Sequence, residues 1–198
     1  MRRITVAITG ASGAIYALRT LRALLMREVA VDVVISEFGW MLLRDEAGFE
    51  GKQQNFGGFI QKLYSVSVDN MSLHPLKNLA ATLASGSAQS DGMVVVPCSM
   101  KTLASIAHGL SRNLIERAAD VALKERRTLI IVPRETPMNL VQLRNMVAVA
   151  EAGAVVVPAM PAFYQKPETF DDLADFVVGR ILSLLGIEHD LYPAWEGG

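Results

Sequence analysis

The stretch Ile4-Thr5-Val6-Ala7-Ile8-Thr9-Gly10-Ala11-Ser12-Gly13-Ala14 decides the fold. It begins as an apolar, β-branched run, the pattern of a strand that is buried on both faces. It then breaks into a loop of small residues, and helical spacing resumes from about Ile15 to Arg27. A strand, a glycine loop and a helix in this order aim backbone N–H groups at an anion, usually a phosphate. A plain tight turn explains the same residues, so this motif alone leaves both interpretations open.

The strand–loop–helix unit recurs along the chain. Further apolar runs predict strands at 29–35, 93–96, 128–132 and 154–157. Periodic segments predict helices that alternate with them, so we expect an α/β fold built on an open parallel sheet. Helices are expected up to about Glu46 and over 59–63, 76–83, 103–107, 113–126, 139–152 and 170–185.

Composition limits the class of protein. The 198 residues suit one domain, with a tail at about 186–198 whose Trp195 docks on the core or on a neighbour. A hydrophobic content of 51% predicts a sheet buried on both faces and some surface covered by other subunits. A net charge of −1 gives no reason to expect nucleic acid or an acidic membrane as a partner.

Cysteine content and hydropathy bear on the compartment. The single cysteine, Cys98, excludes an internal disulfide and favours a reducing compartment. No uncharged apolar run reaches the roughly 18 residues of a membrane span. We therefore expect a cytoplasmic protein. Nothing flanking Cys98 activates it as a nucleophile, so we do not assign it a catalytic role.

Polar residues follow several strands, where the ligands of a parallel sheet gather. Ser36 follows the second strand, and Pro97-Cys98-Ser99-Met100-Lys101-Thr102 follows the third. Arg134 and Glu135 follow the fourth, in a turn stiffened by two prolines. A cation and a carboxylate beside a phosphate site suit acid–base chemistry. The alternatives are a helix N-cap for Ser36, solvation for Lys101 and an exposed charged turn for Arg134 and Glu135.

Two pairs of basic residues border apolar helical stripes. Arg117 and Lys124 lie two turns apart in the helix 113–126 and can reach a groove or a neighbouring subunit. The alternative is a surface ladder of ion pairs, with Asp120 four residues before Lys124. Arg19 and Arg22 lie beside the apolar stripe of the first helix, and we expect them to be solvated.

The last helix opens with Asp171-Asp172-Leu173-Ala174-Asp175, an Asp-Asp-x-x-Asp pattern. All-helical prenyl-diphosphate enzymes hold magnesium with such a pattern, but the strands predicted here contradict an all-α fold. Thr169 is instead predicted to be an N-cap, with acids in the first turn complementing the helix dipole. Tyr164, just upstream, can donate to an anion or pack on this helix, and Arg180 lies beside the apolar face of the helix.

Together, these motifs make the chain resemble the flavin prenyltransferases of the UbiX type over nearly its whole length. The resemblance is carried by five segments: Thr9–Gly13, Pro97–Leu103, Arg117–Glu125, Val132–Pro137 and Pro161–Tyr164. It implies a three-layer Rossmann-like or flavodoxin-like α/β fold with helices on both faces of a parallel sheet. It also implies a homododecamer built from trimers and no required metal.

The resemblance further implies the reaction. Members join the prenyl group of dimethylallyl monophosphate to N5 of reduced FMN and then close a ring at C6. The prenylated FMN passes to a UbiD-type decarboxylase. Many relatives carry a tryptophan before the Ala-Ser-Gly-Ser loop, whereas counting back from that loop places Leu79 there. The aromatic wall of the prenyl pocket is therefore a departure in this chain.

Site roles follow from the resemblance by position. The implied catalytic residues are Glu135, which is the acid–base residue, Glu46, which is a further acid near the flavin, and Ser12. The implied FMN contacts are Gly10, Ala11, Ser12, Ser36, Ser99, Met100, Lys101, Thr102 and Arg134. The implied prenyl-phosphate contacts are Tyr164 and Arg180, joined by Arg117 and Lys124, the latter two from the same or an adjacent subunit.

Two other functions remain to be weighed. The first is an FMN-dependent decarboxylase of a cysteine-containing substrate, which shares the fold and uses a histidine base; His74 is the candidate here. The second is a flavin carrier without catalysis. The set of cationic residues favours the prenyltransferase, because a departing phosphate needs fixed positive charge and the decarboxylation does not.

Overall fold

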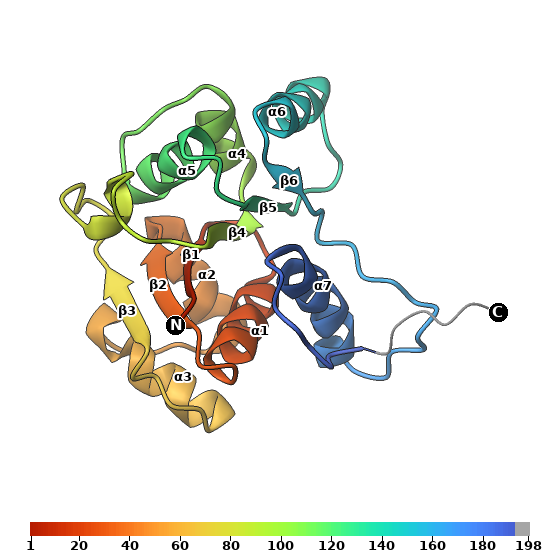
Figure 1. Cartoon of the computed structure of the whole chain (residues 1–198). Helices are drawn as coiled ribbons and strands as arrows, with labels where there is room; N and C mark the ends of the chain where they lie inside the picture. Colours follow the sequence, from red (N-terminus) through yellow and green to blue (C-terminus); the bar gives the residue numbers. More distant parts are fainter. Residues whose placement is uncertain (193–198) are drawn as a thin grey trace.

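The structure is a computed structural model that describes residues 1–192. Within these residues, six strands form one parallel sheet in the order β3-β2-β1-β4-β5-β6 (Figure 1). The strands are β1 (Arg3–Ile8), β2 (Ala30–Ile35), β3 (Met71–His74), β4 (Gly92–Cys98), β5 (Leu129–Pro133) and β6 (Val155–Val156). The expected three-layer α/β fold is confirmed.

Helices cover both faces of the sheet (Figure 1). One face carries α1 (Ala14–Leu25), α2 (Glu37–Ala47), α3 (Phe56–Tyr64) and α7 (Phe170–Leu184), whose apolar residues share one core with one face of the strands. The other face carries α4 (Met100–Ala107), α5 (Leu114–Lys124) and α6 (Leu140–Glu151), which share a second core. The central strands are buried along nearly their whole length. The sequences of β4 and β5 are therefore unbroken apolar runs, whereas β1 and β2 also bury Thr5 and Asp32.

The topological switch point lies between β1 and β4. On one side of β1, the next strands of the chain, β2 and then β3, add to the sheet. The chain then crosses to the other side of β1, where β4, β5 and β6 follow in order. Ligands of open α/β sheets bind outside the carboxyl ends of the strands at such a point. Thr9 ties the two loops there, since its Oγ1 donates to Pro97 O and accepts from the Ser99 N–H, both at 2.8 Å.

The segment between α2 and β4 departs most from expectation. β3 was not predicted, because Met71-Ser72-Leu73-His74 is a short edge strand of mixed polarity. The helix expected over 76–83 is wrong: turns lead there to a single 3₁₀ turn, η2 (Thr82–Ala84). The 3₁₀ turn η1 (Gln53–Asn55) leads into α3, which is longer than the expected 59–63.

The expectation that Arg19 is solvated is also wrong. Its side chain is one-tenth exposed and forms ion pairs with Asp171 and Asp175 of α7, the first at 2.8 Å. Asp172 forms a capping box with Thr169, which confirms the N-cap. The acids of the Asp-Asp-x-x-Asp pattern thus serve helix capping and the α1–α7 contact.

The residues directly after α7 pack against the core. Ile187 is buried, and Arg2 donates to the carbonyl oxygens of Leu185 and Gly186, the latter at 2.6 Å. Trp195 lies outside the described residues. Among residues 1–192, no helix is both long and apolar enough to cross a membrane.

Candidate active site

The loop after β1 gathers three of the predicted site residues. The Glu46 carboxylate, from the end of α2, accepts from the N–H groups of Gly13 and Ala14, both at 2.9 Å. Gly13 gives α1 no side-chain cap, so a carboxylate from another helix supplies the negative charge at this N-terminus. Arg134 reaches the same loop, its Nε donating to the Ser12 carbonyl oxygen at 3.0 Å.

The protonation of Glu46 follows from these contacts. Burial alone raises the pKa of its carboxyl group, but hydrogen bonds from the Ser12 side chain and from the Ala14 and Gly13 N–H groups outweigh it. With the Arg134 charge nearby, the net effect is a lowered pKa. Glu46 is therefore an ionised acceptor at neutral pH.

A pocket of about 350 Å³ opens beside this loop at the switch point. We call it the switch-point pocket. Ser36 and Ser99 lie in it and also cap helices, accepting from the N–H groups of Gly39 and Thr102 at 3.0 and 3.3 Å. The N-cap alternative for Ser36 is therefore confirmed, and Ser99 is a cap as well, while contact of either serine with a ligand stays a prediction. The switch-point pocket is lined by five predicted FMN contacts: Gly10, Ser36, Ser99, Lys101 and Thr102.

The other predicted FMN contacts flank these two places. Ala11 is nearly buried, and its N–H donates to the Thr9 carbonyl at 3.0 Å. Met100 opens α4 and packs against the second core. Glu135, the predicted acid–base residue, follows Arg134 in the chain. Its Oε1 accepts a hydrogen bond from the Thr136 N–H at 3.0 Å.

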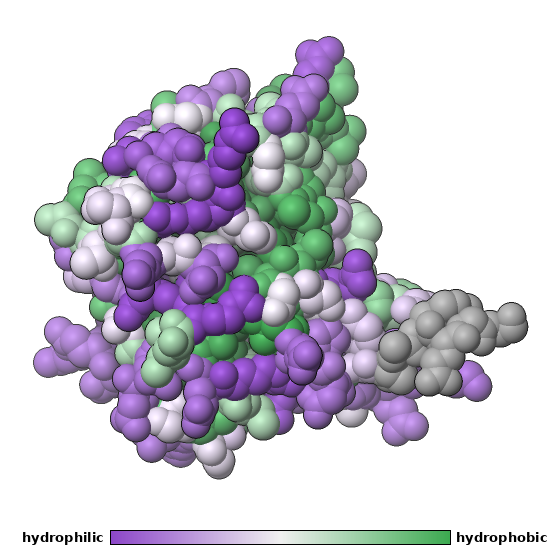
Figure 2. Space-filling model, in the orientation of Figure 1, coloured by the Kyte–Doolittle hydropathy of each residue, from purple (hydrophilic) through white to green (hydrophobic). Residues whose placement is uncertain are grey.

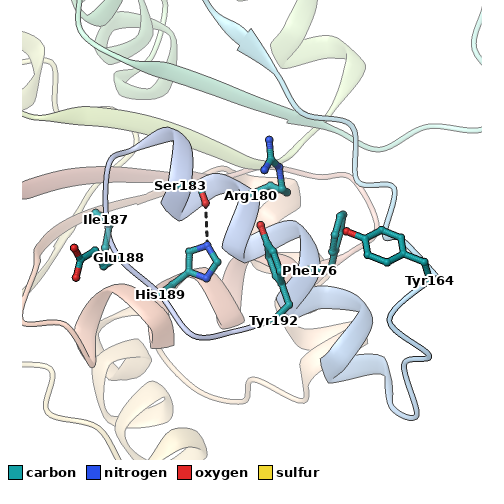
Figure 3. Close-up of a pocket in the computed structure, with 8 residues that line it drawn as sticks. All are labelled: Tyr164, Phe176, Arg180, Ser183, Ile187, Glu188, His189 and Tyr192. Atoms are coloured by element: carbon teal, nitrogen blue, oxygen red, sulfur yellow. Dashed lines mark hydrogen bonds between the residues drawn. The ribbon is translucent and has the colours of Figure 1, made fainter. Parts of the chain in front are cut away.

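Tyr164 and Arg180 line a second, larger cavity of about 740 Å³ beside α7, with Phe176 between them (Figure 3). The rings of Tyr164 and Phe176 are nearly perpendicular, with centroids 6.0 Å apart. Ser183 Oγ and His189 Nε2 lie 2.9 Å apart at the far side. Arg180 forms no hydrogen bond or ion pair within residues 1–192, so its charge is available to an anion.

Arg117 and Lys124 are not brought to this cavity. They lie on α5, on the opposite face of the sheet from α7. Arg117 donates to the Ala84 carbonyl at 3.1 Å and pairs with Asp120 at 2.7 Å, while Lys124 pairs with Glu125 at 3.0 Å. The alternative of an Asp120–Lys124 pair is therefore wrong, because Asp120 pairs with Arg117 and Lys124 pairs with Glu125. Within one subunit, these cations face the loop that contains Ala84 and Gly86.

Two other candidates are separated from the flavin contacts. His74 lines a different pocket, and its Nε2 lies 2.7 Å from Oδ1 of the buried Asp32. Cys98 is fully buried, and burial raises the pKa of its thiol far above its ordinary value. Neither residue lines the switch-point pocket.

Sequence reasoning missed several residues of the switch-point pocket. Phe38, Leu76 and Asn113 line it, as do Glu37, Ile115 and Glu116. Phe38 had a readable signal, because it follows Ser36 at the carboxyl end of β2. Leu76 and the start of α5 had none, since only the fold brings them to this edge.

Comparisons with known proteins agree with the geometry. The Flavoprotein family model matches residues 1–182. The protein named flavin prenyltransferase UbiX from Halalkalibacterium halodurans is 48% identical over 191 residues, covering 96% of this chain and 92% of its own length. The UbiX of Pseudomonas aeruginosa is 44% identical, with 98% of this chain and 93% of its own length covered.

Solved structures are equally similar. AnUbiX (PadA1), in complex with FMN and dimethylallyl pyrophosphate, superposes with a TM-score of 0.87 at 42% identity, covering 100% of this chain and 98% of that one. A dodecameric FMN-dependent UbiX-like decarboxylase from Escherichia coli O157:H7 gives a TM-score of 0.85 at 40% identity, covering 98% and 100%.

Proposed function

The chain belongs to the flavin prenyltransferase family, and from that membership we infer that it joins the dimethylallyl group of dimethylallyl monophosphate to N5 and C6 of reduced FMN. The observation that carries the proposal is the meeting of Ser12, Glu46 and Arg134 at one loop, next to a pocket at the switch point. We further infer that the chain acts as one flavin-binding domain, that copies assemble into a dodecamer, and that a UbiD-type decarboxylase receives the product.

The switch-point pocket and its flanking loops form the flavin side of the site. Ser36, Lys101 and Thr102 offer hydroxyl and ammonium donors there, and the loop from Gly10 to Ser12 lies beside them. Because Glu46 occupies the N–H groups of Gly13 and Ala14, the flavin phosphate uses donors other than these two. Ser99, Met100 and Arg134 complete the flavin contacts.

Tyr164 and Arg180 form the donor side. A monophosphate is a poor leaving group, so fixed cations and hydroxyl donors must stabilise the charge that grows on it as its C–O bond breaks. Arginine suits this task because its guanidinium is permanently charged and planar. Arg117 and Lys124 add to this charge from an adjacent subunit, since within one subunit they lie across the sheet from Arg180.

The carboxylates of Glu135 and Glu46 act as proton acceptors in the proposed reaction. After the prenyl cation has bonded at N5, closure of the ring at C6 releases a proton, and Glu135 accepts it and passes it to the departing phosphate. Glu46, ionised and next to Ser12, serves as a second acceptor near the flavin. Apolar walls keep water from the cation. Figure 2 shows apolar surface in the hollow between the α4–α6 half and the α1–α7 half.

The test is direct. The protein is mixed anaerobically with reduced FMN and dimethylallyl monophosphate, and the flavin is analysed by mass spectrometry for the gain of one prenyl unit. Loss of carbon dioxide from a cysteine-containing substrate without a flavin mass gain would instead support a decarboxylase, the activity in the name of the E. coli structure. Binding of FMN with neither reaction would leave a flavin carrier.

A further inference from the structure

We propose that Phe38 is a further flavin-contacting residue, whose ring packs against one face of the isoalloxazine system in the switch-point pocket. The proposal rests on the proposed function, because it takes FMN as the ligand of this pocket. It extends the site to a residue that no motif above included.

The exposure of Phe38 sets it apart from the other aromatic residues of its region. Its side chain is 60% exposed, whereas Trp40, Phe49 and Phe56 are at most 6% exposed and pack edge to face or tilted in the core. The fold therefore does not use the Phe38 ring. An apolar ring left in water at a pocket gains free energy when a ligand with an apolar face covers it.

The backbone of Phe38 is held firmly in place. A Cβ added to Gly10 would lie 2.3 Å from Phe38 Cβ, and one added to Gly39 would lie 2.6 Å from Ile8 O. Only glycines at both positions allow the first turn of α2 to press so closely on the end of β1. The Ser36 cap fixes the same turn. The backbone and Cβ of Phe38 are thus fixed at the pocket, which lowers the cost of bringing the ring into contact with a ligand.

The pocket offers two kinds of wall. Phe38, Leu76 and Ile115 are apolar, whereas Ser36, Lys101 and Thr102 are donors. A flavin has the matching division, with a flat aromatic ring system at one end and a hydroxylated, phosphorylated arm at the other. Aromatic rings prefer offset-stacked or edge-to-face contacts, which Phe38 can make with the ring system. A free sugar phosphate would leave the apolar wall uncovered.

The experiment compares the binding of two flavins to wild type and to variants of the full chain. Oxidised FMN and riboflavin are titrated into wild type, F38A and S36A, and dissociation constants are measured. For F38A we expect about tenfold weaker binding of both flavins, because the lost contact is to the ring system they share. S36A should lose more affinity for FMN than for riboflavin.

Met41 provides the matched control. It is 44% exposed and lies on the next turn of the same helix, outside the switch-point pocket. M41A should bind both flavins like wild type. F38L, which keeps apolar bulk without an aromatic ring, should bind both flavins better than F38A and less well than wild type.

Three results would overturn the inference: F38A binding both flavins within twofold of wild type, a loss confined to FMN, or equal losses in M41A. Wild type that binds neither flavin would instead refute the proposed function. Wild type that prenylates FMN while F38A behaves identically would refute only the role of Phe38.

Discussion

Arg134 donates from Nε to the backbone carbonyl oxygen of Ser12 at 3.0 Å, joining two loops that are 122 positions apart in the chain. This contact uses only one of the five N–H groups of the guanidinium. The remaining N–H groups form no hydrogen bond or ion pair within residues 1–192. The arginine can thus fix the glycine loop and bind a ligand with the same side chain.

Replacing Arg134 by lysine should weaken FMN binding about tenfold, because an ammonium group cannot hold the Ser12 carbonyl and a ligand in one planar fork. Fluorescence titration with FMN measures this. The control is R144K, since Arg144 is exposed on α6 and lies away from this loop. An R134K protein with wild-type affinity would show that Arg134 has only a structural role.

Replacing Glu46 by alanine should lower the free energy of unfolding by about 1 kcal/mol, because α1 loses the acceptor at its N-terminus. E46Q keeps an acceptor oxygen and should lose less stability, but it should lose prenylation activity as E46A does. Urea unfolding and turnover are the two measurements. D45A, the exposed neighbour, should match wild type in both; stability of E46A equal to that of wild type would contradict the capping role.

Replacing Glu135 by glutamine should reduce prenylation by at least about 100-fold while FMN binding is retained, because only the proton transfer is lost. Turnover and FMN titration separate the two effects. E151Q, an exposed substitution at the end of α6, should change neither. Unchanged turnover in E135Q would remove the acid–base role and favour the flavin carrier.

The placement of Arg117 and Arg180 on opposite faces of the sheet predicts complementation between subunits. R117A and R180A should each be nearly inactive. Chains co-expressed in equal amounts should recover activity at about a quarter of the sites, because a site then takes each arginine from a different chain. Activity should not recover when the R180A chain is co-expressed with a Y164F chain. Each site takes Tyr164 and Arg180 from the same chain, so every site in this pair lacks one of the two. No recovery in the first pair would mean that Arg117 does not reach the donor site from an adjacent subunit.

Replacing Asp32 by asparagine should destabilise the fold in a pH-dependent way. Burial raises the pKa of this carboxyl group, but hydrogen bonds from His74 and Arg3 outweigh it, and the net pKa is lowered. The stabilisation is thus present above the unfolded pKa near 3.9 and is lost as the pH falls through the lower folded value.

Urea unfolding at two pH values checks this expectation. D32N should be less stable than wild type by about 2 kcal/mol at pH 7, with the difference narrowing at pH 3. D45N, at an exposed carboxylate, is the control. A difference that stayed constant between the two pH values would exclude the ionised Asp32 as its origin.

The fold could be predicted from the sequence where local signals and burial agree. The apolar run Met93–Val96 predicts a strand because both of its faces are buried, and Ser36 and Thr169 are recognisable as caps because they precede periodic segments. Leu76, Leu79 and Leu83 have helical spacing, yet no α-helix forms there. Residue spacing does not reveal whether a surface exists for a helix to pack on.

Long-range contacts could not be predicted. Arg19 forms ion pairs with acidic residues of α7 that lie about 150 positions away in the chain. Glu46, at the end of α2, accepts a hydrogen bond from the first residue of α1. The family resemblance predicted which residues belong to the site, but it did not predict these contacts between them. It also could not place Phe38, because the closeness of Gly10 to the first turn of α2 is a property of the folded backbone.

The burial of Cys98 has a practical consequence. It is the only cysteine in the chain, it is fully enclosed in the core that β4 shares with α4, and its raised pKa keeps it in the unreactive thiol form. Maleimide dyes should therefore not react with Cys98 in the folded protein. They should label only a cysteine introduced at an exposed position. A fluorophore or spin label placed near Tyr164 or on α5 could then report subunit exchange and ligand arrival in solution, with the native thiol left in place.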